Sequence, residues 1–152
     1  MGLALRHVGI VVSNLDEALH VYKNYLQCSV VKIYPEVEGN YINDLVGIPN
    51  VLIKVAILKT RDENRIELIE YVKEVGQKRD KILANNIGAS HFALSVENID
   101  QLYIDSERYN VKFLSEPLLS PEGFVKVAYA VIMDECLVEL VEVLDERRKK
   151  SG

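Results

Sequence analysis

The chain has 152 residues and a mass of 17.2 kDa, which fits one compact domain or two very small ones sharing a core and excludes a multidomain enzyme. Hydrophobic residues make up 49% of the chain and charged residues 27%, a composition typical of globular proteins rather than disordered or fibrous ones. The 18 basic and 23 acidic residues give a net charge of −5, which argues against nucleic acid as a partner.

Features of membrane and secreted proteins are missing from the sequence. No apolar run approaches the roughly 20 residues that a membrane helix needs, and the start of the chain enters a strand-like run without the pattern of a secretion signal. Two cysteines, Cys28 and Cys136, are most simply reduced thiols, with a disulfide between them as the alternative. We therefore expect a cytoplasmic protein with no membrane contact.

The sequence contains an internal repeat. Residues 6–18 align without a gap on residues 90–102, at an offset of 84. Residues 51–72 align on residues 123–144 at an offset of 72, and eight of these 22 pairs are identical. Ordinary residue usage gives roughly one or two identities in such a window. The chain is therefore two copies of one unit.

The two copies differ in length. The offsets differ by 84 − 72 = 12, so the first copy carries about a dozen extra residues, around residues 34–50, where prolines and glycines predict a loop. We predict one domain spanning the whole chain. Its parts are module one (1–72), a polar linker with room for one helix (73–89), module two (90–145) and a basic, solvated tail (146–152).

Both copies show the same order of predicted elements. In chain order these are a strand (8–12), a helix (15–26) and strands (29–34, 51–58, 65–72), then a strand (92–96), a helix (99–109) and strands (111–114, 124–131, 137–143). Ser13 and Asn98 are the candidate helix N-caps. The predicted fold class is α+β, with two tandem βαβββ modules. Because neither module can bury its sheet alone, the two are expected to form one curved mixed sheet around a cavity.

The repeat places four metal-competent side chains at corresponding points. His7 and His91 start the first strand of each copy, and Glu67 and Glu139 lie in the last. One such histidine or glutamate alone is usually a polar strand residue. Paired by the repeat, two imidazoles and two carboxylates indicate a shared site for one divalent transition ion: Ni, Co, Zn, Mn or Fe(II). The cavity is thus predicted to contain a metal.

Other polar residues are predicted to lie outside this site. Glu70 and Glu142, also matched by the repeat, are three residues beyond Glu67 and Glu139 and so face the other side of an extended strand, where charged surface positions are expected. The third histidine, His20, has no counterpart in the second copy and is interpreted as a surface or core residue.

Four segments resemble the vicinal oxygen chelate superfamily, also called the glyoxalase/bleomycin resistance protein/dioxygenase superfamily: RHVGIVVSNLDEALHVYKNYL, RIELIEYV, SHFALSVENIDQL and LVELVEV. The resemblance covers nearly the whole chain and implies that His7, Glu67, His91 and Glu139 are the metal ligands. Residues 125–129 and the chain length look most like the methylmalonyl-CoA epimerase branch, with glyoxalase I (lactoylglutathione lyase) next.

Both branches use the ion to polarise a carbonyl or enediolate oxygen while a base moves a proton on the adjacent carbon. The resemblance implies a homodimeric, metal-dependent isomerase or lyase acting on a small molecule: an acyl-CoA, a hemithioacetal or a small oxo acid. It also implies that Glu67 or Glu139 is both ligand and base. Tyr129 is a candidate proton donor or substrate contact, and packing is its simpler role. Val55 stands where some epimerases have a dedicated glutamate and cannot abstract a proton.

Two other functions are compatible with the resemblance. An Fe(II) ring-cleaving dioxygenase typically uses two histidines and one carboxylate, so the second glutamate counts against it. An antibiotic- or metabolite-binding protein of the bleomycin resistance type generally lacks the four ligands, so their presence favours an enzyme.

Overall fold

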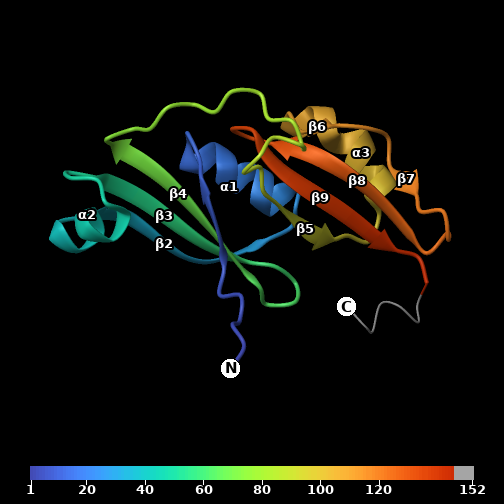
Figure 1. The fold of residues 1–152 in the computed structure, drawn as a ribbon, viewed down its shortest axis with the longest axis horizontal. Helices are drawn as coiled ribbons and strands as arrows, with labels where there is room; N and C mark the ends of the chain where they lie inside the picture. The colour runs from blue at the N-terminus through green and yellow to red at the C-terminus, as the bar shows by residue number, and fades with distance from the viewer. Residues whose placement is uncertain (146–152) are drawn as a thin grey trace. The chain divides into compact units, whose positions relative to one another are not determined.

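The computed structural model describes residues 1–145 and divides into two compact units, Met1–Lys78 and the residues from Arg79 onward (Figure 1). Each unit contains one mixed sheet with helices on it, which confirms the predicted α+β class with a βαβββ order of elements in each half. The predicted basic tail, 146–152, lies outside the described residues.

Unit 1 contains a four-stranded sheet in the order β1-β4-β3-β2. Its elements are β1 (Val8–Val11), α1 (Leu15–Asn24), β2 (Ser29–Glu38), α2 (Asn40–Val46), β3 (Leu52–Lys59) and β4 (Arg65–Lys73). Strand β1 is parallel to β4, whereas β3 is antiparallel to both of its neighbours. The predicted strands and first helix are confirmed to within a few residues at their ends.

Unit 2 repeats this order around the sheet β5-β9-β8-β6, with β7 paired to β8. Its elements are β5 (His91–Ser95), α3 (Ile99–Asp105), the short 3-10 helix η1 (Ser106–Tyr109), β6 (Lys112–Phe113), β7 (Leu118–Leu119), β8 (Val125–Ile132) and β9 (Cys136–Val143). The predicted helix over 99–109 is thus split, and β7 was not predicted. The helix predicted in the linker is wrong, because residues 74–90 are irregular or in turns.

Helix α1 begins where an asparagine can cap it. The Asn14 side chain accepts a hydrogen bond from the Glu17 amide at 3.0 Å, and Asn98 does the same for Gln101 at the start of α3. The prediction of Asn98 is confirmed, whereas Ser13 is one residue early. Both carboxamide oxygens satisfy an amide that has no partner within the helix.

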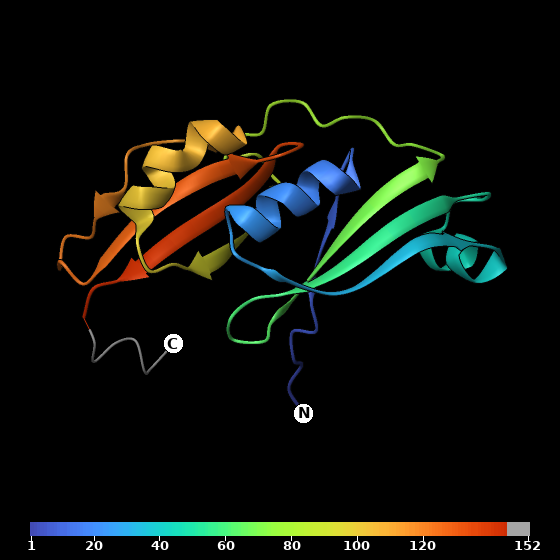
Figure 2. The same cartoon turned by 180° about the vertical axis from the view of Figure 1, so that it is seen from behind.

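The two faces of the unit 1 sheet carry different elements. Helix α1 packs on the face formed by alternating residues such as Leu58, Ile66 and Leu68, all at most 2% exposed. Helix α2 packs on the other face, where Ile42 joins a buried cluster with residues that include Val55. The views in Figures 1 and 2 show the two helices on opposite sides of this sheet.

Helix α2 lies inside the segment that the sequence predicted as a loop. Strand β2 continues through Pro35. An edge strand tolerates proline because its outer amides need no partner within the sheet. The register of β2 against β3 shifts between Tyr34 and Val37. Gly47 then ends α2 in the left-handed conformation, with φ 71°. The Asn43 carboxamide accepts a hydrogen bond from the Val51 amide at 3.0 Å and ties the helix to the start of β3.

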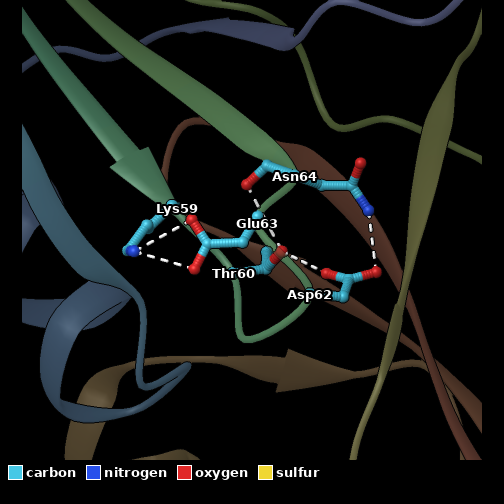
Figure 3. A network of polar contacts seen from close by, with 5 residues as sticks. All are labelled: Lys59, Thr60, Asp62, Glu63 and Asn64. Carbon is cyan, nitrogen blue, oxygen red and sulfur yellow. Dashed lines mark hydrogen bonds and ion pairs between the residues drawn. The ribbon is translucent and has the colours of Figure 1, made fainter.

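A polar turn joins β3 to β4 (Figure 3). Thr60 donates to Asp62 at 2.5 Å, Asn64 donates to the second Asp62 oxygen at 2.7 Å, and Lys59 reaches both Glu63 oxygens at 2.8 and 2.9 Å. The hydrogen bond from Thr60 is the main reason that the pKa of Asp62 is lowered. The turn sets the pairing of β3 with β4.

Neither Cys28 nor Cys136 forms a disulfide within residues 1–145. Cys28 is buried, and its burial raises the pKa of the thiol to about 11. A thiol in this state is protonated at neutral pH and is a poor nucleophile. The prediction of reduced thiols is confirmed for this structure.

Candidate metal centre

The first half of the candidate site is a histidine and a glutamate brought together by β1 and β4. Gly9 is the parallel partner of Glu67, and His7 lies two residues before Gly9, on the same face. The His7 Nε2 atom lies 3.4 Å from the nearer Glu67 carboxylate oxygen. The two side chains are 43% and 26% exposed, so a ligand can reach both.

Unit 2 reproduces this arrangement. Glu139 pairs with Ala93 across β5 and β9, and His91 lies two residues before Ala93 on the same face. The His91 Nε2 atom lies 3.3 Å from a Glu139 oxygen, and these side chains are 38% and 28% exposed. The same His–Glu pair is therefore present in both units, with nearly the same distance.

The spacing within each pair suits two neighbouring donors on one ion. Bonds of about 2.0–2.1 Å at a tetrahedral angle place two ligand atoms about 3.4 Å apart. A charge-assisted hydrogen bond between the same groups is shorter, about 2.7–2.9 Å. The nitrogen and oxygen atoms are also donors that a divalent transition ion accepts. Each pair thus fits half of a four-ligand coordination sphere.

Within residues 1–145, no group of three or more His, Cys, Asp or Glu side chains is arranged to hold a metal ion. Each unit brings one histidine and one glutamate together on its own sheet.

The two halves differ at the neighbouring position on the middle strand. Tyr129 is the cross-strand partner of Glu139, whereas its counterpart Ile57 is the partner of Glu67. The Tyr129 hydroxyl lies 3.4 Å from His91 Nε2, and the two rings are edge to face with centroids 4.9 Å apart. A hydroxyl group at this point can donate a proton or a hydrogen bond beside His91 and Glu139, which the isoleucine of unit 1 cannot do beside His7 and Glu67.

Glu70 and Glu142 lie on the face opposite Glu67 and Glu139, as predicted, but the expectation of charged surface positions is wrong. Glu70 is only 18% exposed and accepts a hydrogen bond from the Leu15 amide at 2.8 Å. Glu142 accepts from the Ile99 amide at 2.9 Å. Each carboxylate therefore holds the N-terminus of the helix of its own unit, where the helix dipole favours negative charge.

Sequence reasoning placed two further residues outside the site. His20 is exposed on α1, with Nδ1 2.9 Å from Nδ2 of the Asn24 side chain, so the surface alternative is confirmed. Val55 is 7% exposed and belongs to the buried cluster that includes Ile42, so it adds an aliphatic surface rather than a base. The sequence analysis missed helix α2, whose Ile42 belongs to this cluster. A sequence signal for it was the spacing of Ile42 and Val46, which are four residues apart and so share one face of a helix.

The family model of the glyoxalase/bleomycin resistance protein/dioxygenase superfamily matches residues 6–129. The chain therefore belongs to this superfamily, as the sequence motifs indicated. Among curated proteins, none matches the chain. No helix among residues 1–145 is long and apolar enough to span a membrane.

Solved structures show the same fold at low sequence identity. A glyoxalase family protein from Bacillus cereus is 22% identical, with a TM-score of 0.84 and 95% of this chain and 97% of that one covered. The trypanothione-dependent glyoxalase I of Leishmania major is 19% identical, with a TM-score of 0.66 and coverage of 99% and 94%. A fosfomycin resistance protein from Listeria monocytogenes, in complex with Mn(II) and sulfate, is 16% identical, with a TM-score of 0.60 and coverage of 97% and 99%.

Proposed function

We propose that the protein is a metal-dependent isomerase or lyase that transfers a proton next to a carbonyl or enolate, as methylmalonyl-CoA epimerase and lactoylglutathione lyase do. The observation that carries the proposal is the duplicated pair of His Nε2 and Glu oxygen, at 3.4 Å in unit 1 and 3.3 Å in unit 2. Membership in a superfamily that includes glyoxalase enzymes supports it.

The proposed ligands are His7, Glu67, His91 and Glu139, acting on one divalent transition ion: Ni, Co, Zn, Mn or Fe. When bound, such an ion polarises a carbonyl oxygen and stabilises the negative charge that develops on it. The Mn(II) of the Listeria relative supports a divalent ion in this fold. The experiment below includes a mixture of variants that tells whether the two pairs belong to one chain or to two copies.

The proposed base is Glu67 or Glu139. A carboxylate can take the proton from the carbon next to the carbonyl and return it to that carbon or its neighbour. The aliphatic Val55 leaves no carboxylate at the position where some epimerases carry one, and Ile57 beside Glu67 has no proton to exchange. The candidate groups for proton transfer are therefore the two glutamates and Tyr129.

The proposed substrate is an acyl-CoA, a hemithioacetal or a small oxo acid, each with a carbonyl or hydroxyl oxygen beside an acidic carbon. We also propose a homodimer, because each unit has a small core. A cytoplasmic location fits the two free thiols.

The first experiment is elemental analysis of chelator-washed protein that has been reloaded with Ni, Co, Zn or Mn. About one tightly held ion per chain is expected. The loaded protein is then tested for epimerisation of methylmalonyl-CoA, for isomerisation of methylglyoxal with glutathione, and for oxygen consumption with a catechol. Failure to take up any of these ions contradicts the enzyme proposal and leaves a ligand-binding protein, while oxygen consumption identifies the dioxygenase alternative.

A mixture of two variants tells whether the four proposed ligands of one ion come from one chain or from two copies of the chain. When studied separately, the His7→Ala and His91→Ala variants are each expected to lose the bound metal. If the ligands come from two copies, mixing the variants restores one complete site in each mixed dimer. If they come from one chain, mixing restores none.

Tyr129→Phe is expected to lower the rate of proton transfer by about 10²–10⁴-fold, the range for a positioned general acid or base. The phenylalanine ring keeps the edge-to-face contact with His91 and removes only the hydroxyl, so the metal content should stay unchanged. The rate and the metal content are measured on the same sample. Full activity in this variant would show that Tyr129 only packs.

A further inference from the structure

Two basic side chains lie next to Glu67 on the same face of the unit 1 sheet. Arg65 is two residues before Glu67 on β4, with no shift of register between them, so the two side chains share one face. Lys59 is the cross-strand partner of Arg65 on β3 and lies on this face as well. Residues two apart on a strand are about 6.6 Å apart, so the long Arg65 side chain can reach a molecule that contacts Glu67.

The pairing of Lys59 with Arg65 is unfavourable for the sheet itself, because like charges at opposed positions of two strands destabilise the pairing. Lys59 is partly neutralised by the Glu63 carboxylate, to which it donates at 2.8 and 2.9 Å. The Glu67 carboxylate lies against His7 at 3.4 Å. The side chain of Arg65 is exposed and forms no ion pair within residues 1–145, so its guanidinium is open to an anion from solution.

Lys32 on β2 is a third cation on this face. It pairs with Ile57, which in turn pairs with Glu67, so Lys32 is two strands away from the carboxylate. Two strand spacings amount to about 9.6 Å. The Lys32 Nζ atom lies 4.6 Å from the centre of the Tyr34 ring, a contact that keeps the ammonium group close to the sheet. Cations therefore gather on this face although the whole chain has a net charge of −5.

Unit 2 has aliphatic residues at the positions equivalent to the basic pair. The repeat offset of 72 places Leu137 at the position of Arg65 and Val131 at the position of Lys59, and these two residues pair with each other. Leu137 is the parallel partner of His91 and is only 3% exposed. The repeated fold thus does not require a charge at this position, and the basic pair is particular to unit 1.

We infer that Arg65 is a specificity residue that binds a carboxylate of the substrate, separate from the oxygens that contact the metal. This inference rests on the proposed function. The planar guanidinium matches a carboxylate through two parallel hydrogen bonds, and a bound anion would also reduce the repulsion between Arg65 and Lys59. Among the proposed substrates, the inference selects those whose reacting part carries its own carboxylate.

The test compares two hydroxamates of the same size on the cobalt-loaded full-length protein. Hydroxamates bind metal ions through two neighbouring oxygens. The monohydroxamate of succinic acid ends in a carboxylate, whereas the hydroxamate of succinamic acid ends in an uncharged amide. The dissociation constants of both are measured at low ionic strength from the visible absorption of cobalt.

The unmodified protein is expected to bind the carboxylate compound more tightly than the amide compound. Arg65→Gln is expected to reduce this preference by about five- to tenfold, between the value of an exposed ion pair and that of a hydrogen bond to a charged group. Affinity for the amide compound should stay the same in this variant, which shows that the fold and the metal site are intact. Arg65→Lys keeps the charge without the planar pair of donors and should retain part of the preference.

The matched control is Lys54→Gln, which removes a positive charge from the opposite face of β3. Lys54 pairs with Glu70 across the strands, and its Nζ atom lies 3.9 Å from the Glu70 carboxylate. This variant should leave the preference for the carboxylate compound unchanged. An equal loss of preference in Lys54→Gln and Arg65→Gln would overturn the inference, because the effect would then come from net charge alone.

The test also separates this inference from the proposed function. If cobalt and both hydroxamates bind but Arg65→Gln leaves the preference unchanged, the inference fails and the metal site stands. If the protein takes up no cobalt, the proposed function fails, and the inference fails with it.

Discussion

Glu67→Gln and Glu139→Gln are each expected to weaken metal binding by at least about a hundredfold. Residues that only support a metal ligand are worth 10–100-fold in affinity, and removal of a ligand carboxylate costs at least as much. The two changes should have similar effects, because the two glutamates stand in equivalent positions beside His7 and His91. Competition with a chelator of known affinity measures the loss in each variant.

The control is Glu70→Gln, a change of the same chemistry three residues further along β4. Glu70 faces α1 rather than His7, so its replacement should leave metal affinity within about twofold of the unmodified protein. If Glu70→Gln weakens metal binding as much as Glu67→Gln does, the measured affinity depends on the stability of the sheet rather than on direct contact with the ion. A loss confined to one of the two ligand variants would contradict a site shared by the two pairs.

Glu70→Ala is expected to lower the free energy of unfolding by about 1.5–3 kcal/mol. A hydrogen bond to a charged group has this value, and the change leaves the Leu15 amide at the start of α1 without its carboxylate. Glu142→Ala should cost a similar amount through the Ile99 amide and α3. Urea unfolding followed by circular dichroism or tyrosine fluorescence measures both, since the chain has eight tyrosines and no tryptophan.

Glu67→Ala is the matched control for stability. Its carboxylate holds no helix, and the side chain is 26% exposed, so its removal should change the free energy of unfolding by less than about 0.5 kcal/mol in metal-free protein. If Glu70→Ala proves as mild as Glu67→Ala, the hydrogen bond to α1 contributes little and the helix is held by its apolar contacts with the sheet.

The tandem fold could be predicted, and the His–Glu pairs proposed as ligands, from the repeat and the alternation of strand residues. A strand alternates between its faces, so Glu67 and Glu70 had to face opposite sides. The repeat placed a histidine at the start of the first strand and a glutamate in the last strand of each copy. The parallel pairing of β1 with β4 and of β5 with β9 was not predicted. This pairing brings the histidine nitrogen and glutamate oxygen to 3.4 Å in unit 1 and 3.3 Å in unit 2.

The role of Glu70 and the presence of α2 depended on three-dimensional context. Nothing in one chain segment shows that a glutamate of β4 reaches an amide 55 residues earlier, at Leu15. Helix α2 has seven residues between Gly39 and Gly47, and so short a helix gains its stability from packing rather than from its own sequence. Ile42 provides that packing against β3.

The turn between β3 and β4 in Figure 3 also determines which side chains of β4 lie on each face of the sheet. If β4 slipped by one residue against its neighbours, Glu67 would move to the face of α1 and Glu70 to the face of His7. The contact of Glu70 with α1 and the His7–Glu67 pair would then be lost together. On the proposed function, an ion held by this pair would add its binding free energy only to the correctly paired state. Metal uptake during refolding would then report whether the strands have paired in the correct register.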